Sequence, residues 1–146
     1  FRCCVGKKGI TKKKVEGDKK TPKGIFPLGP IFYRSDKNKK PSSKIKLIEI
    51  KRNMGWCNDI NSSKYNKLIN IKESIKHEKM YRKDRKYDLV LLIKYNFVNP
   101  MKKKGSAIFI HCTENFKGTL GCVALKKSDL LILIKLIKKN TKIEII

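Results

Sequence analysis

The sequence predicts one domain with a mainly β fold and one main helix. Short apolar runs bounded by Gly, Pro and Asn recur along the chain, as they do in folds built from short strands. Only one segment, near the C-terminus, has helical periodicity. At 146 residues the chain is long enough to bury a core without disulfides or metals, so we treat residues 1–146 as a single domain.

The first third of the chain is predicted to contain two extended segments and a long polar loop. FRCCVG (1–6) is strand-like and ends at its glycine. Because the chain opens inside this strand at Phe1 and not at a methionine, we expect that N-terminal residues are missing upstream. The polar, Gly-rich stretch that follows is predicted to be a loop, with a turn at Pro22 and Gly24. IFPLGPIFYR (25–34) is predicted to be extended, although its two prolines interrupt it.

The middle of the chain is predicted to hold two strands on either side of an irregular region. A solvated loop (35–43) leads into KIKLIEI (44–50), which has strand character. Residues 52–87 show no clear period and contain the only tryptophan, which favours a functional loop over a core element. DLVLLIKYN (88–96) is almost continuously apolar, which indicates a strand buried on both faces.

The segment SAIFIHC (106–112) is predicted to be a second strong strand, and CVAL (122–125) a short one. Side chains alternate between the two faces of a strand. One face of 106–112 should therefore carry Ala107, Phe109 and His111, and the other Ile108, Ile110 and Cys112.

The helix is predicted to follow these strands. Ser128 is a good N-cap, Asp129 suits the positive end of a helix, and Asn140 can end it. TKIEII (141–146) is predicted to be a closing strand. The apolar stripe of the helix, at helical spacing, consists of Leu130, Leu133, Ile134 and Ile137.

The net charge of +25 raises the question of a nucleic-acid ligand. Only five of the 37 basic residues are arginine, and the lysines are spread along the chain, as expected when an AT-rich genome fills solvated positions with lysine. No helix-turn-helix, zinc-finger or aromatic RNA-binding pattern is present, so we expect no specific nucleic-acid ligand. A basic surface also suits an acidic polymer, including a bacterial cell wall. No apolar run is long enough to span a bilayer, and no signal peptide is visible in this chain.

The five cysteines do not form a recognisable framework. Their number is odd and no CxxC is present, so at least one thiol should be free. Adjacent residues such as Cys3 and Cys4 are poor partners for one zinc ion. A zinc site built from His111, Cys112 and Cys122 would need a fourth ligand such as Cys57 or His77, and we do not favour it.

The stretch GTLGCVAL (118–125) places Gly121 directly before Cys122. A nucleophilic cysteine needs a nearby base and donors for the oxyanion that its attack creates. Gly121 lets the backbone approach a carbonyl closely, and His111, at the end of the preceding strand, could be the base. Taken alone, this pattern leaves a buried, inert cysteine as the default interpretation.

Several segments in the right order resemble the L,D-transpeptidase catalytic-domain (YkuD-like) family of bacterial cell-wall enzymes. The resemblance spans nearly the whole chain. Segments 16–29 (EGDKKTPKGIFPLG), 105–111 (GSAIFIH) and 119–125 (TLGCVAL) are similar to the opening motif and the active-site segments of the family. The compact single-domain branch is suggested by GWCND…SSKYN, HEKMYRKDRKYD and IKYN, at 55–66, 77–88 and 93–96. The chain departs from the commoner members at Leu120 and Ala124, where they carry His and Arg.

The resemblance implies a β-sandwich or barrel-like catalytic fold and a covalent mechanism. His111 would take the proton of Cys122, and the thiolate would attack the carbonyl of the third residue of a peptidoglycan tetrapeptide stem. The terminal D-alanine would leave, and the side-chain amine of a second stem would resolve the thioester into a 3→3 cross-link. Backbone N–H groups of Leu120, Gly121 and Cys122 are the expected oxyanion hole. The mechanism needs no metal or cofactor, and the family implies the bacterial cell envelope or periplasm.

Other residues carry a functional and a structural interpretation. Packing of the loop around Trp56 is the alternative to a substrate groove, and a packed thiol is the favoured interpretation of Cys57. His77 and Glu78 could form a pair that orients catalytic groups, or a purely structural pair. Asp18 and Thr21 are expected to shape their loop, and Ser106 to hydrogen-bond near His111. The candidate substrate-binding residues are Thr119, Trp56, Asp59, Tyr65, Asn66 and Ser106.

Two alternatives to the transpeptidase remain open at this point. The same acyl-enzyme could be resolved by water, which would make the protein an L,D-carboxypeptidase or a wall amidase. A non-catalytic basic module that binds wall polymer or nucleic acid is the second alternative, and it predicts that Cys122 is dispensable. We expect peptidoglycan stem peptides as the partner, and a monomer.

Overall fold

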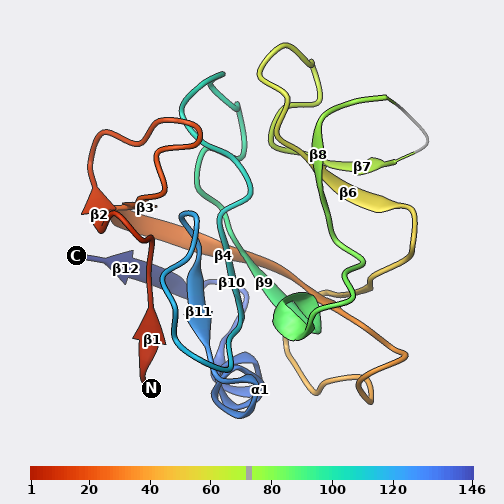
Figure 1. Ribbon diagram of the computed structural model, residues 1–146. Coiled ribbons are helices and arrows are strands. Elements are labelled where there is room, and N and C mark those ends of the chain that lie inside the picture. The colour runs from red at the N-terminus through yellow and green to blue at the C-terminus, as the bar shows by residue number, and fades with distance from the viewer. Residues whose placement is uncertain (72–73) are drawn as a thin grey trace.

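The computed structural model describes residues 1–71 and 74–146, and in this part of the chain it has one α-helix and three sheets (Figure 1). The largest sheet has seven strands in the order β1–β11–β10–β9–β4–β12, with β5 also paired to β4. The prediction of a mainly β fold with one main helix is confirmed. The strands of this sheet are β1 (Cys3–Cys4), β4 (Gly24–Tyr33), β5 (Leu47–Glu49), β9 (Leu89–Ile93), β10 (Phe109–Cys112), β11 (Val123–Leu125) and β12 (Lys142–Ile145).

Two small sheets occupy regions that the sequence predicted to be loops. In the first, β2 (Ile10–Thr11) pairs in parallel with β3 (Thr21–Pro22), so the turn expected at Pro22 and Gly24 is wrong. In the second, β6 lies between β7 and β8 in antiparallel pairing, so residues 52–87 are not irregular. These strands have two to four residues each, too few for an alternating pattern to emerge. The second sheet consists of β6 (Met54–Cys57), β7 (Leu68–Asn70) and β8 (His77–Lys79), followed by the 3-10 turn η1 (Arg85–Tyr87).

Strand β9 is the centre of the large sheet and is buried along its whole length, as its apolar run predicted. One face of the sheet packs on α1, through a core that includes Leu91, Ile110 and Leu130. The other face packs on the β6–β7–β8 sheet, through a core that includes Trp56 and Phe109. The alternation predicted for residues 106–112 is confirmed, because the even and odd positions divide between these two cores. The protein is therefore layered, with the large sheet in the middle.

Helix α1 (Lys127–Leu136) is shorter than predicted at its C-terminal end. Its N-cap is Lys126, which makes no side-chain cap bond, so the prediction of Ser128 as N-cap is wrong. The Ser128 hydroxyl instead lies 3.5 Å from the Asp129 carboxylate, inside the first turn. Leu130 and Ile134 face the core, in agreement with the predicted stripe.

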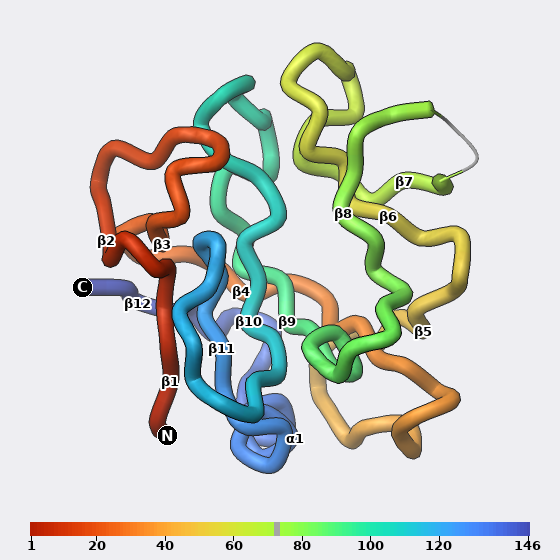
Figure 2. Tube along the Cα trace, in the orientation of Figure 1, coloured from red at the N-terminus to blue at the C-terminus, as the bar shows by residue number. Residues whose placement is uncertain are grey.

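The long strand β4 accommodates both of its prolines because of where they lie. The β4–β9 register shifts between Leu28 and Ile31, so Pro30 falls in a bulge, where a missing N–H disturbs the ladder least. Strand β10 begins only at Phe109, because Ala107 has a φ of 54° and cannot continue a strand. Figure 2 shows both chain ends on the same side of the molecule, away from the β6–β7–β8 sheet.

Candidate active site

Cys122 and His111 lie on the same face of two neighbouring parallel strands. The β10–β11 register pairs His111 with Ala124, and Cys122 precedes Ala124 by two positions. Because side chains alternate along a strand, all three point toward the face that the β6–β7–β8 sheet covers. Cys122 belongs to the buried core on that face, and the ring of His111 lies 5.5 Å from the ring of Tyr87 in the same core.

The Cys122 thiol is held by the backbone of the strand next to it. The S–H donates to the carbonyl of Ala107 at 3.2 Å, and Sγ accepts from the N–H of Phe109 at 3.4 Å. The residue is 8 % exposed. Burial raises the pKa of the thiol to about 12, and the negative charge of Glu78 acts in the same direction. At neutral pH the Cys122 side chain is therefore a neutral thiol, which could act as a nucleophile only by giving its proton to a base.

His111 is oriented as a base by the backbone. Its Nδ1 lies 2.9 Å from the carbonyl oxygen of Cys112. A carbonyl oxygen can only accept, so Nδ1 carries the hydrogen and Nε2 keeps the lone pair. Burial lowers the pKa of His111 below its ordinary value of 6.5. The imidazole is thus neutral at pH 7 and can accept a proton at Nε2.

The turn before the nucleophile is fixed by two hydroxyl groups. Thr119 Oγ1 donates to the carbonyl of Cys122 at 2.6 Å and accepts from the N–H of Gly121 at 3.1 Å. Thr21 donates to the same carbonyl at 3.4 Å. Gly121 has a φ of 141°, and a Cβ there would lie 3.0 Å from the carbonyl oxygen of Lys20, so the position requires glycine. Thr119, one of the expected substrate-binding residues, braces the turn through its hydroxyl.

The hydrogen bonds of Thr119 also limit which backbone amides could form the expected oxyanion hole. The N–H of Gly121, one of three candidate donors, is engaged by Thr119. The amides of Leu120 and Cys122 are the better remaining candidates for this role. The side chain of Leu120 is 69 % exposed beside the nucleophile, where a substrate can contact it.

Replacing Thr119 by valine should destabilise the protein by about 1–3 kcal/mol, because it removes the main donor to a buried carbonyl and the acceptor of the Gly121 N–H. Urea denaturation would measure the change. Thr119→Ser keeps the hydroxyl and should restore most of the loss. Equal stability of the valine variant and the wild type would show that this brace contributes nothing.

Three of the predicted substrate-binding residues lie inside the protein. Trp56, Tyr65 and Asn66 are each 2 % exposed. The indole N–H of Trp56 donates to Asn66 Oδ1 at 2.8 Å, and its ring packs edge-on against Phe109. These three side chains therefore pack in the interior, in the manner of the alternative interpretation, loop packing around Trp56.

Ser106 and Tyr65 meet at a carboxylate that the sequence reasoning did not single out. Both donate to Glu16 Oε2, at 2.8 and 2.5 Å, and the Tyr65 hydroxyl also accepts from the N–H of Gly105 at 3.0 Å. Ser106 therefore bonds to Glu16 and not near His111. Asp59 accepts from the N–H of Asn61 at 2.9 Å and, with Glu16, lines a hollow of about 490 Å³. Glu16 is the acidic residue that opens the EGD motif, and this position in the motif was the sequence signal that could have identified it.

His77 and Glu78 do not pair with each other. His77 Nδ1 lies 2.6 Å from the carbonyl of Ile75, whereas the Glu78 carboxylate accepts a short hydrogen bond from Tyr87. Neighbouring positions on β8 point to opposite faces, which explains the separation. Cys57 is fully buried, in agreement with a packed thiol.

Asp18 organises its loop, as expected. Its carboxylate lies 2.5 Å from Lys14 Nζ and accepts from the N–H groups of Val15 and Lys20, both at 2.9 Å. These contacts hold the pKa of Asp18 below its ordinary value, although burial opposes them. Thr21 accepts from the N–H of Gly6 at 2.8 Å. The two residues therefore shape the segment that packs against the nucleophile turn.

The geometry does not support the zinc alternative. Cys112 points to the opposite face of β10 from His111, and its thiol lies 3.7 Å from the carbonyl of Leu89. Within residues 1–71 and 74–146, no group of three or more His, Cys, Asp or Glu side chains could hold a metal ion.

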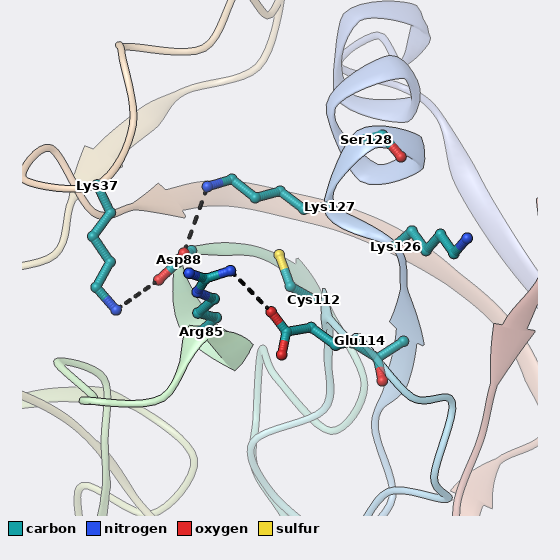
Figure 3. Close-up of a pocket in the computed structure, with 9 residues that line it drawn as sticks. Lys37, Arg85, Asp88, Cys112, Glu114, Lys126, Lys127 and Ser128 are labelled. Atoms are coloured by element: carbon teal, nitrogen blue, oxygen red, sulfur yellow. Dashed lines mark hydrogen bonds and ion pairs between the residues drawn. The ribbon is translucent and has the colours of Figure 1, made fainter.

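A hollow of about 820 Å³ lies on that opposite face, and neither Cys122 nor His111 lines it. Figure 3 shows ion pairs between several of the charged groups that line this hollow. Asp88 lies 3.2 Å from Lys37 and 3.5 Å from Lys127, and Arg85 lies 3.2 Å from Glu114. The hollow is lined by Lys37, Arg85, Asp88, Cys112, Thr113, Glu114, Lys126, Lys127 and Ser128.

Comparison with known proteins identifies the family of the chain. Residues 1–145 match the family described as YkuD, the L,D-transpeptidase catalytic domain. No curated protein and no solved structure matches the chain. The family match covers both strands of the candidate active site and the EGD segment, so it includes every residue discussed above except Ile146.

Proposed function

Because the chain belongs to the L,D-transpeptidase catalytic-domain family, we propose that it is a cysteine acyltransferase of bacterial peptidoglycan that forms 3→3 cross-links through a thioester on Cys122. One observation carries the proposal. Cys122 lies on the same sheet face as His111, whose Nδ1–H bond to the Cys112 carbonyl leaves Nε2 free to accept a proton. A buried thiol beside a correctly oriented neutral imidazole is the arrangement that acyl transfer requires.

In the first half-reaction, Cys122 Sγ attacks the carbonyl of the third residue of a tetrapeptide stem. The thiol proton passes to His111 Nε2, because a thiol whose pKa is raised to about 12 cannot ionise alone at neutral pH. The amides of Leu120 and Cys122 stabilise the oxyanion. The C–N bond to D-alanine then breaks, and the imidazolium returns its proton to the leaving amine.

In the second half-reaction, the side-chain amine of another stem attacks the thioester. The C–S bond breaks as the new amide forms, and the thiol is regenerated. The chain would act as a single domain and a monomer in the bacterial cell envelope, where this substrate lies. No helix of the described residues is long and apolar enough to cross a membrane.

Incubation with a purified disaccharide tetrapeptide would test the proposal. Intact-protein mass spectrometry should show an acyl adduct, and the products should include a 3→3 cross-linked dimer with release of D-alanine. If the products are tripeptides and no dimer forms, the protein hydrolyses the acyl-enzyme and does not transfer it. If the thiol reacts with iodoacetamide and yet no adduct forms with the tetrapeptide, the proposal is wrong.

The acylation rate should fall in acid with a midpoint below pH 6.5, because burial lowers the pKa of His111 and only the neutral imidazole accepts a proton. His111→Ala should lower the rate by about 10²-fold or more and remove this acid limb. His77→Ala, at the only other histidine, should keep the rate and the profile. Stopped-flow or mass-spectrometric acylation across pH would measure both. An unchanged profile in His111→Ala would exclude His111 as the base.

A further inference from the structure

A partly buried carboxylate, Glu78, lies beside the candidate active site. It comes from β8, where it pairs in register with Trp56 of β6. One of its oxygens accepts the hydrogen bond of the Tyr87 hydroxyl. This bond fixes Glu78 through Oε1 and leaves Oε2 as the oxygen that a ligand would engage.

Tyr87 connects Glu78 to both catalytic residues. Its ring lies 5.5 Å from the ring of His111, and Tyr87 and Cys122 belong to the same buried core. The charge of Glu78 acts directly on the Cys122 thiol, and no other carboxylate does so to a comparable extent. Burial raises the pKa of Glu78, which makes this carboxylate a better proton acceptor than a solvated one.

The other charges near the site are mainly cationic. Arg82 and Lys86 act on His111, and Lys14 acts on Cys122. Arg82 is itself paired with Asp84 at 2.7 Å. In a chain of net charge +25, an incoming ammonium group would be repelled from this region unless a carboxylate attracts it.

We propose that Glu78 binds the ammonium group of the acceptor stem and accepts a proton from it, and that Tyr87 holds Glu78 in place for this role. The inference rests on the proposed function, and it assigns to Glu78 the binding and deprotonation of the acceptor in the second half-reaction. It makes Glu78 the residue that favours an amine over water as the acceptor.

The proposed step balances in protons and electrons. The acceptor arrives as R–NH3⁺ and gives one proton to the Glu78 carboxylate, which leaves a neutral amine. The nitrogen lone pair forms the C–N bond to the thioester carbonyl, and the electrons of the broken C–S bond stay on sulfur. The second proton of the amine passes through His111 Nε2 to the sulfur. Glu78 then releases its proton to solvent.

Competition between two acceptors tests this assignment. The acyl-enzyme formed from a tetrapeptide is offered Nα-acetyllysine, whose side chain is cationic at neutral pH, or hydroxylamine, which is uncharged there. Glu78→Gln keeps an oxygen that can accept from Tyr87 and removes the charge. The ratio of transfer to Nα-acetyllysine over transfer to hydroxylamine should fall by about tenfold or more in this variant. Glu144→Gln removes the same charge from an exposed position on β12 and should leave the ratio unchanged.

Provided that the acyl-enzyme still forms, three results would overturn the inference. They are an unchanged ratio in Glu78→Gln, equal losses of transfer to both acceptors, and an equal effect of Glu144→Gln on the ratio. Absence of an acyl-enzyme in the wild type would instead overturn the proposed function. Thermal melting checks the fold. If Glu78→Gln does not fold, Tyr87→Phe decides, because it keeps the ring against His111 and releases Glu78; its ratio should fall, and an unchanged ratio would overturn the inference.

Discussion

Replacing Cys122 by alanine should abolish the acyl adduct with a tetrapeptide stem or a carbapenem, with a loss of rate of about 10³-fold or more. The reason is chemical, because the proposed bond is made by the Cys122 sulfur and alanine has no nucleophilic atom in its place. His111 and the neighbouring backbone would remain in place, since a methyl group fits the space of the thiol. Intact-protein mass spectrometry against time measures the adduct directly.

Cys112→Ala is the matched control. Cys112 lies on the adjacent strand β10 and is also buried, but it faces the α1 core, and burial raises the pKa of its thiol to about 11. The Cys112→Ala variant should therefore acylate at the wild-type rate once its fold is verified. Persistence of the adduct in Cys122→Ala, or its loss only in Cys112→Ala, would contradict the assignment of the nucleophile.

Replacing Asn66 by alanine should lower the free energy of unfolding by about 3 kcal/mol or more, the largest stability effect that we expect from a polar residue. Its Oδ1 accepts from Trp56 Nε1 at 2.8 Å and from the N–H of Ala107 at 3.0 Å. Its Nδ2 donates to the carbonyls of Tyr95 and Asn96, at 3.1 and 2.7 Å. Each buried group left without a partner costs about 1–3 kcal/mol. Alanine would also have to adopt the φ of 57° of this position.

The same substitution should slow acylation in protein that remains folded. Ala107 provides the carbonyl that accepts the S–H of Cys122, and Asn66 holds the amide of that same residue. Urea denaturation and acylation rates would measure the two effects. Asn115→Ala, at an exposed position, should change stability by no more than about 0.5 kcal/mol. A loss below about 1 kcal/mol in Asn66→Ala would show that the four hydrogen bonds are not essential.

The strands of the large sheet could be predicted from the sequence because their signals are local. The continuous apolar run of β9 indicated burial on both faces, and the alternation in 106–112 assigned Phe109 and His111 to one face. The β6–β7–β8 sheet could not be predicted, since its strands are too short to show an alternating pattern and their pairing joins segments separated along the chain. The N-cap of the helix was misplaced, because the helix begins without any side-chain cap.

The sequence by itself determined which residues could be the nucleophile, the base and the required glycine: Cys122, His111 and Gly121. Residue type and position relative to a strand end made them candidates, and the resemblance to a known family favoured the catalytic interpretation over an inert cysteine. Only the tertiary structure decided which groups Asn66 and Glu78 contact. Asn66 joins β6 to Ala107, and Glu78 accepts the hydrogen bond of Tyr87, whose ring lies near that of His111. These contacts join segments far apart in the chain, so they cannot be predicted from the spacing of residues within any one segment.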